Sequence, residues 1–283
     1  MRGEVRSPRL SPVAAGMAVT LACGVALLAA GGAPGSWLIV QSVAAAAALA
    51  LLAAPRVSPM AFWPQMLAVL TPAALVATLL IDPGLDGVHR WLQLGGVRLH
   101  PGQMLLPALV ALHARDPRGA SGAALTVSAA LLVVQPDFGT ALAVACALVT
   151  IALLRRRLVD WMLAAAAGVA AATASTMADP LEPVAMVEHV LTDSWAIAPW
   201  AGLLALVGAV AFPGGLWLAA GRMRPLATAP LTLAALWFGL LLASLIGHFP
   251  VPLLGYGVSA IIGFGLAARI VCAVPGQVSP SKS

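Results

Sequence analysis

The sequence predicts an all-α integral membrane protein, and its composition, run length and charge placement each support that class. Of the 283 residues, 61% are hydrophobic and only 9% are charged, with a mean hydropathy of +0.99. A soluble domain carries about 25% charged residues. The apolar runs are long and rich in Ala and Leu, without a period of two, which favours helices over a barrel. We therefore expect one polytopic membrane domain over residues 1–283.

Charged residues, prolines and glycines divide the chain into ten apolar segments, which we interpret as about ten transmembrane helices. A spanning helix takes roughly 17–25 residues, so the fourth and fifth segments are short. We expect those two to be tilted, broken or shielded by neighbouring helices. The basic N-terminus also fits a signal peptide, but its apolar run is long, and we interpret it as an uncleaved first helix; cleavage after it stays an alternative. The predicted spans are 13–33, 37–54, 61–81, 103–114, 121–135, 137–154, 159–178, 196–219, 227–247 and 255–273.

The basic residues predict the orientation of these helices, because cytoplasmic loops carry an excess of Lys and Arg. With the N-terminus inside, 13 of the 15 basic residues fall on the cytoplasmic side and only Arg90 and Arg98 fall outside. Both termini are therefore expected to be cytoplasmic, as tails 1–12 and 274–283. The net charge of +5 does not indicate a nucleic-acid partner, since these charges form no continuous stripe. The inner residues are Arg2, Arg6, Arg9, Arg56, Arg115, Arg118, Arg155, Arg156, Arg157, Arg222, Arg224, Arg269 and Lys282.

The first outer loop reads DGVHRWLQLGGVRLHPGQ over residues 86–103 and holds both outer arginines. Arg suits two-pronged contact with phosphate oxygens, so Arg90, Trp91 and Arg98 indicate recognition of an anionic headgroup or a diphosphate. The structural alternative is that these arginines pair with Asp82 or Asp86 while Trp91 anchors the loop at the membrane interface.

A polar segment, QPDFGTA, interrupts the apolar sequence at residues 135–141. An ionisable residue beside a membrane span is costly and usually marks a functional site, so we expect Gln135, Asp137 and Thr140 to contribute to one. An Asp before a helix is also a common N-cap, and Asp137 can cap the helix that starts at Phe138. Burial of its carboxylate calls for a partner, for which the outer arginines are the candidates.

The second outer loop, DPLEPVAMVEHVLTDSW over residues 179–195, carries four carboxylates and His189. Such carboxylates can act as a general base on a sugar hydroxyl, or hold a divalent cation against a diphosphate. The alternative is a solvated acidic loop without a specific role.

In this order, these segments resemble the SEDS family, the FtsW/RodA/SpoVE-type peptidoglycan glycosyltransferases. Residues 135–141 match the family's Q-P-D-x-G-T-A, and residues 87–95 are similar to its G-x-R-R-W-(I/L)-x-L-G. FPVPLLGYGVS at 249–259 resembles L-P-x-P-F-x-S-Y-G-G-S, and residues 179–181 look like the D-P-x-G that opens the large outer loop. The resemblance covers about residues 60–273.

The resemblance implies polymerisation of lipid II, or of another isoprenoid-diphosphate-linked sugar, at the outer face of the bacterial cytoplasmic membrane. It also implies a class B penicillin-binding protein as partner, in cell-wall synthesis, cell shape or division. Asp179 would be the general base, with Asp193 in reserve, and a divalent cation stays open as a cofactor. The residues expected to bind substrate are Arg90, Trp91, Arg98, Gln135, Asp137 and Thr140.

The chain departs from the family pattern at several positions. Gln103 stands where the motif Q-P-S-E-x-x-K has its Glu, and Leu106 stands where it has its Lys. Gly255 replaces the serine of S-Y-G-G-S, and the large outer loop lacks its glycine-rich middle. The alternative function is therefore a non-catalytic relative that binds the lipid carrier or scaffolds a cell-wall complex. A carrier-lipid transporter is a third hypothesis, which only the multi-span architecture suggests.

Overall fold

The computed structural model describes residues 11–54, 63–95, 97–177, 179–223 and 227–273. These residues form eleven helices and one two-stranded hairpin. Most of both predicted tails, and the predicted inner residues Arg56 and Arg224, lie outside the described ranges. The elements are α1 (Pro12–Ala30), α2 (Gly35–Ala53), α3 (Trp63–Ile81), β1 (Leu92–Leu94), β2 (Val97–Leu99), α4 (Pro101–Arg115), α5 (Gly119–Val134), α6 (Phe138–Arg155), α7 (Leu158–Ser175), α8 (Val190–Ile197), α9 (Pro199–Arg222), α10 (Thr228–Ile246) and α11 (Val258–Cys272).

The predicted all-α membrane class is confirmed. Seven of the described helices are long and apolar enough to cross a membrane, namely α1, α2, α3, α6, α7, α9 and α10. All ten predicted spans coincide with a helix, and α4 and α5 are short, as expected. The short helix α8 lies in a stretch that was expected to be loop. The number of helices that cross the membrane, and the side on which the termini lie, stay predictions.

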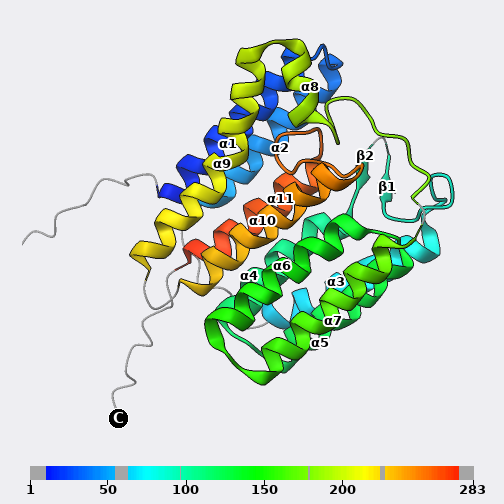
Figure 1. The fold of residues 1–283 in the computed structure, drawn as a ribbon, viewed down its shortest axis with the longest axis vertical. Coiled ribbons are helices and arrows are strands. Elements are labelled where there is room, and N and C mark those ends of the chain that lie inside the picture. The colour runs from blue at the N-terminus through cyan, green and yellow to red at the C-terminus, as the bar shows by residue number, and fades with distance from the viewer. Residues whose placement is uncertain (1–10, 55–62, 96, 178, 224–226, 274–283) are drawn as a thin grey trace, which may run out of the picture.

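Most of the helices run along one common direction and form a single bundle (Figure 1). At one edge α1 packs along α9, and α10 and α11 connect this edge to α4 and α6. At the other edge α5 packs on both α3 and α7. Phe212, Trp237 and Phe264 meet edge to face in the interior, with ring centroids 5.5–5.7 Å apart. Such aromatic contacts add to the packing that holds helices together in lipid, where burial from water contributes little.

Arginines at the end of the bundle opposite the hairpin satisfy carbonyls at the C-termini of neighbouring helices. Arg155 donates to the Ala114 carbonyl at 2.6 Å, and Arg269 donates to the Ala54 carbonyl at 2.6 Å. Arg115 donates to the carbonyls of Ile270 and Ala273. The last carbonyls of a helix lack partners within it and carry partial negative charge, so these cations stabilise α4, α2 and α11.

The hairpin and α8 lie at the same end of the bundle (Figure 1). Strands β1 and β2 pair antiparallel with Gln93 opposite Arg98, and Gly95 turns the chain with a φ of 60°. The loop before α8 docks on the loop before α11, because the Val251 N–H donates to the Val187 carbonyl at 3.3 Å. The side chain of Gln41 holds the loop before α11 by donating to the Gly255 carbonyl at 3.1 Å. This end of the molecule carries the candidate site.

Candidate functional site

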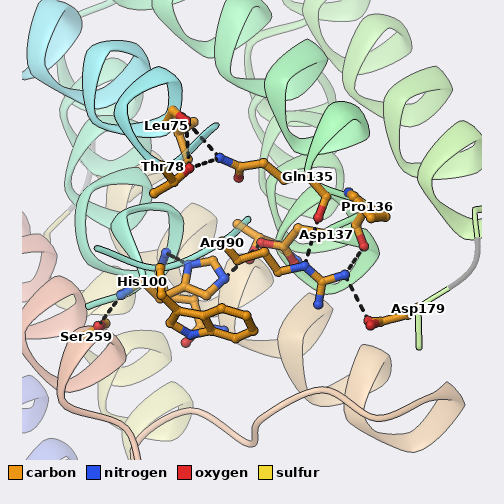
Figure 2. Close-up of polar contacts among 12 residues, drawn as sticks. Leu75, Thr78, Arg90, His100, Gln135, Pro136, Asp137, Asp179 and Ser259 are labelled. Carbon is orange, nitrogen blue, oxygen red and sulfur yellow. Dashed lines mark hydrogen bonds and ion pairs between the residues drawn. The ribbon is translucent and has the colours of Figure 1, made fainter. Parts of the chain in front are cut away.

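Arg90 connects the three polar segments that the sequence singles out (Figure 2). Its Nε donates to the Gln135 carbonyl at 2.9 Å, and one terminal nitrogen donates to the Pro136 carbonyl. The same nitrogen forms an ion pair with Asp179 Oδ2 at 2.8 Å. Arg90 is only 4% exposed, whereas the Asp179 side chain is 24% exposed. The guanidinium is therefore fixed by carbonyls, and the carboxylate is reachable from solvent.

The alternative pairing of Arg90 with Asp82 or Asp86 is not what the structure has. Asp82 accepts hydrogen bonds from the Trp91 and Gly84 N–H groups, each at 3.2 Å. It therefore shapes the loop that leads to Arg90. The guanidinium of Arg90 pairs instead with Asp179, which lies 89 residues further along the chain.

Asp137 caps α6, as its position predicts. Its Oδ1 accepts the Thr140 N–H at 3.0 Å, and the residue is 2% exposed. The partner of its other oxygen is His100, whose Nε2 lies 3.2 Å from Oδ2 (Figure 2). The outer arginine that was expected as partner, Arg90, interacts with Asp137 through its charge. Its hydrogen bonds go to the carbonyls of Gln135 and Pro136, so His100 is the nearer partner.

His100 is the residue of this site that sequence reasoning missed. The ring Nδ1 of His100 accepts the Gln103 N–H at 3.2 Å and so caps α4. The backbone N–H of His100 donates to Ser259 Oγ at 2.8 Å. Because Nδ1 accepts, the neutral ring carries its proton on Nε2, the nitrogen that lies 3.2 Å from Asp137 Oδ2. The histidine's place directly before Pro101 is a helix-start signal, but its partner Asp137 is distant in sequence.

Gln135 and Thr140 hold the backbone around Asp137. The Gln135 side chain donates to the Leu75 carbonyl at 2.9 Å and to Thr78 Oγ1 at 2.6 Å, which joins the end of α5 to α3. The Thr140 hydroxyl is buried and has no hydrogen-bond partner among the described residues. Their contacts position Arg90 and Asp137, and their expected role in binding substrate stays a prediction.

Trp91 and Arg98 lie at the edge of this arrangement. The Trp91 ring meets His100 edge to face, with centroids 5.9 Å apart. Arg98 is exposed on β2 and does not join the Arg90 contacts. It lines a shallow surface depression next to the site. The other residues that line the depression are Asp82, Pro83, Gly84, Leu85, Trp91 and Gln93.

The carboxylates of the second outer loop separate into different environments. Asp179 reaches Arg90, whereas Asp193 Oδ2 accepts the Met186 N–H at 3.3 Å and stabilises the turn before α8. Glu188 Oε2 accepts the Val184 N–H at 2.8 Å. Burial raises the pKa of the Glu188 carboxyl; backbone N–H groups and His189 counteract this rise, and the charge of Asp179 adds to it. Of the two predicted bases, Asp179 and Asp193, only Asp179 contacts Arg90 among the described residues.

A preformed metal cluster does not occur in the part of the chain that the structure describes. No three His, Cys, Asp or Glu side chains of these residues gather so as to hold a metal ion. A cation bound here against a diphosphate would therefore draw several ligands from the substrate or from water, as Mg²⁺ commonly does.

Comparison with known proteins places the fold. No family model matches the sequence, and no curated protein matches it significantly. The rod shape determining protein RodA of Thermus thermophilus superposes with a TM-score of 0.67 at 18% identity, over 90% of this chain and 94% of that one. An aspartate-to-alanine mutant of that RodA gives the same score. A peptidoglycan synthase complex, described as coordinating polymerization and crosslinking, scores 0.60 at 20% identity.

The fold thus defines an α-helical membrane protein with a SEDS-like architecture. More particularly, the chain has the fold of RodA over nearly its whole length, which confirms the resemblance seen in the motifs.

Proposed function

We propose that this protein is a glycosyltransferase that polymerises lipid II at the outer face of the bacterial cytoplasmic membrane. The single observation that carries the proposal is the ion pair between Arg90 and Asp179. It joins the first outer loop, the Gln135–Pro136 backbone and the second outer loop at one point. The RodA-like fold supports the same activity class.

The chemistry requires a base and an anion-binding group at the same place. The oxygen of an acceptor sugar hydroxyl attacks the anomeric carbon of the donor, and the bond to the diphosphate oxygen breaks. The hydroxyl proton passes to Asp179, and the diphosphate leaves with the bonding electrons. A cation that faces the leaving group stabilises the charge that develops there.

Arg90 and Asp179 can exchange partners when a diphosphate binds. A guanidinium binds phosphate oxygens in the same forked geometry as a carboxylate. A bound diphosphate therefore competes with Asp179 for Arg90, and the released carboxylate becomes free to accept a proton. The 24% exposure of the Asp179 side chain leaves room for this movement.

The second candidate function is a non-catalytic SEDS-like protein that binds the lipid carrier or scaffolds a cell-wall complex. Gln103 and Leu106, which replace the family's Glu and Lys, favour it. In either case we expect a class B penicillin-binding protein as partner, and the likeness to a peptidoglycan synthase complex supports that expectation.

The test uses purified full-length protein in liposomes, incubated with lipid II, with and without a class B penicillin-binding protein of the same organism. Glycan polymer on gels would support the glycosyltransferase. Saturable lipid II binding without polymer in both preparations would support the non-catalytic alternative. Absence of both polymer and binding would contradict both functions.

A further inference from the structure

Two histidines meet at the outer end, away from the contacts of Arg90. His189 Nε2 lies 3.0 Å from His248 Nδ1, and the rings are tilted by 55° with centroids 5.1 Å apart. His189 directly precedes α8 and His248 follows α10, so 59 residues separate them in sequence. The chain has five histidines; His89, His100 and His113 have other contacts.

The separation of the two nitrogens is close to that of two ligands of one metal ion. A zinc–nitrogen bond of about 2.0–2.1 Å and tetrahedral angles place two ligand nitrogens about 3.3–3.4 Å apart. The 3.0 Å distance between His189 Nε2 and His248 Nδ1 would need to grow by only a few tenths of an ångström. Without a metal, one ring donates its N–H to the other. Metal binding would break this hydrogen bond, move the donated proton to the far nitrogen of its ring, and turn both rings so that their lone pairs meet at an ion beside the N···N line.

The surroundings of the pair favour a cation and leave it accessible. Glu188 directly precedes His189 in the chain, and its carboxyl interacts electrostatically with that histidine. His248 is exposed and His189 is half-buried, so an ion from solution reaches both rings. Imidazole suits Zn²⁺, Cu²⁺ and Ni²⁺, whereas Mg²⁺ prefers oxygen ligands.

We propose that His189 and His248 form an outward-facing site for a transition-metal ion, with Zn²⁺ as its occupant. Water fills the remaining positions, at least one more than in zinc sites that have three protein ligands and a single open position. This site differs from a carboxylate-held cation on a diphosphate, and it exists whether or not the protein polymerises lipid II.

A metal at this position links two loops that flank the candidate site. His189 ends the loop that carries Asp179. His248 lies next to Phe249, whose ring meets Phe138 at the start of α6, with centroids 5.7 Å apart. The two loops already share the backbone bond from Val251 to Val187. Metal binding would connect the loop that carries Asp179 to the segment after α10, which contacts the start of α6 next to Asp137.

The test is a Zn²⁺ titration of the full-length protein, purified in detergent with an affinity tag other than polyhistidine. Calorimetry should give one ion per chain, and Co²⁺ should give visible absorption bands at the same stoichiometry. His189→Gln and His248→Gln should each weaken binding at least about tenfold, since loss of even an outer-shell partner costs 10–100-fold. The control His89→Gln, in the first outer loop, should bind as wild type does.

Thermal unfolding supplies a second readout. Zn²⁺ should raise the Tm of the wild type and of His89→Gln, because a ligand of the folded state stabilises it by mass action. Neither His189→Gln nor His248→Gln should show that rise, although both should unfold near the wild-type Tm without metal. Equal Zn²⁺ affinity in the wild type, His189→Gln and His248→Gln would show that the ion binds to residues other than these two histidines. That result, or no saturable binding in the wild type, would overturn the proposal.

Discussion

At the scale of single residues, Asp137 shows why this position requires a carboxylate. One of its oxygens accepts the Thr140 N–H, and the other lies 3.2 Å from Nε2 of His100. An amide has only one acceptor oxygen. Whichever way an asparagine is placed, its NH₂ group therefore meets another donor, either His100 or Thr140.

Asp137→Asn is accordingly expected to lower stability by roughly 1–3 kcal/mol, the cost of leaving a buried polar group unpaired. Thermal unfolding in detergent and the yield of monodisperse protein would measure the loss. The matched control is Asp116→Asn, because Asp116 forms an exposed ion pair with Arg118. Equal stability of the two variants would show that the capping carboxylate is dispensable.

Glu188 predicts a pH dependence of stability. Burial raises the pKa of this carboxyl above 4.5 in the folded protein, so the folded state binds more protons than the unfolded state just above that pH. Stability then falls as pH rises through the window from 4.5 to the folded pKa. The variant Glu188→Gln lacks this carboxyl and should not lose stability in this way. The Tm of Glu188→Gln minus the Tm of the wild type should therefore increase as pH rises through that window.

The exposed neighbour Glu182 provides the control for this experiment. Glu182→Gln should show a Tm difference from the wild type that does not grow with pH. A constant offset between Glu188→Gln and the wild type across the same buffers would contradict the assignment.

The residues of the site were only partly predictable from sequence. The cap at Asp137 follows from its position directly before an apolar helix, and Arg90 stands out as a cation on the predicted outer side. The pairings with Asp179 and His100 join residues 89 and 37 positions apart, as the numbering shows. Such pairings depend on how α4, α6 and the second outer loop come together, and no local pattern encodes that.

At the scale of elements, α6 and α10 approach closely at Gly239. A Cβ at this position would lie 2.5 Å from the Cα of Ala143, so backbone and not a flexible side chain opposes it. Small residues at such crossings let helices approach and pack in lipid.

Gly239→Ala should therefore destabilise the protein by about 1–3 kcal/mol, the usual cost of overpacking. Gly168→Ala in α7 is the matched control, because nothing lies within 4 Å of its added Cβ. It should be neutral or stabilising, since Ala favours a helix over Gly by about 1 kcal/mol. Unfolding of both variants in the same detergent compares them. A Gly239→Ala protein as stable as Gly168→Ala would mean that the helices can separate at no cost.

The sequence predicted the long helices well and the short elements poorly. Apolar runs bounded by Pro, Gly and charge placed the ten segments within a few residues of the helices. The hairpin has strands of three residues each, and α8 has eight residues within an acidic stretch. Segments this short show too few periods of hydrophobicity to be recognised, and tertiary contacts hold them in place.

At the scale of the whole molecule, we expect the hairpin to face outward and the loop between α9 and α10 to face the cytoplasm. In a variant without the native cysteines, Gln93→Cys should react with a membrane-impermeant maleimide in intact cells. Arg222→Cys should react only after permeabilisation, because the excess of Arg places its loop inside. Both residues are exposed, so accessibility to the reagent reports sidedness. The reverse labelling pattern would invert the topology and remove the site from the outer face.

We expect Asp179, and not Asp193, to be the base of a lipid II polymerase. The most direct measurement is the polymerisation rate of reconstituted Asp179→Ala and Asp193→Ala proteins at equal folded amounts. Because general base catalysis contributes about 10²–10⁴-fold, Asp179→Ala should lose at least about 100-fold in rate. Asp193→Ala, which loses only a contact to the Met186 N–H, should retain most of its activity. Activity that survives Asp179→Ala, or a loss confined to Asp193→Ala, would contradict the claim.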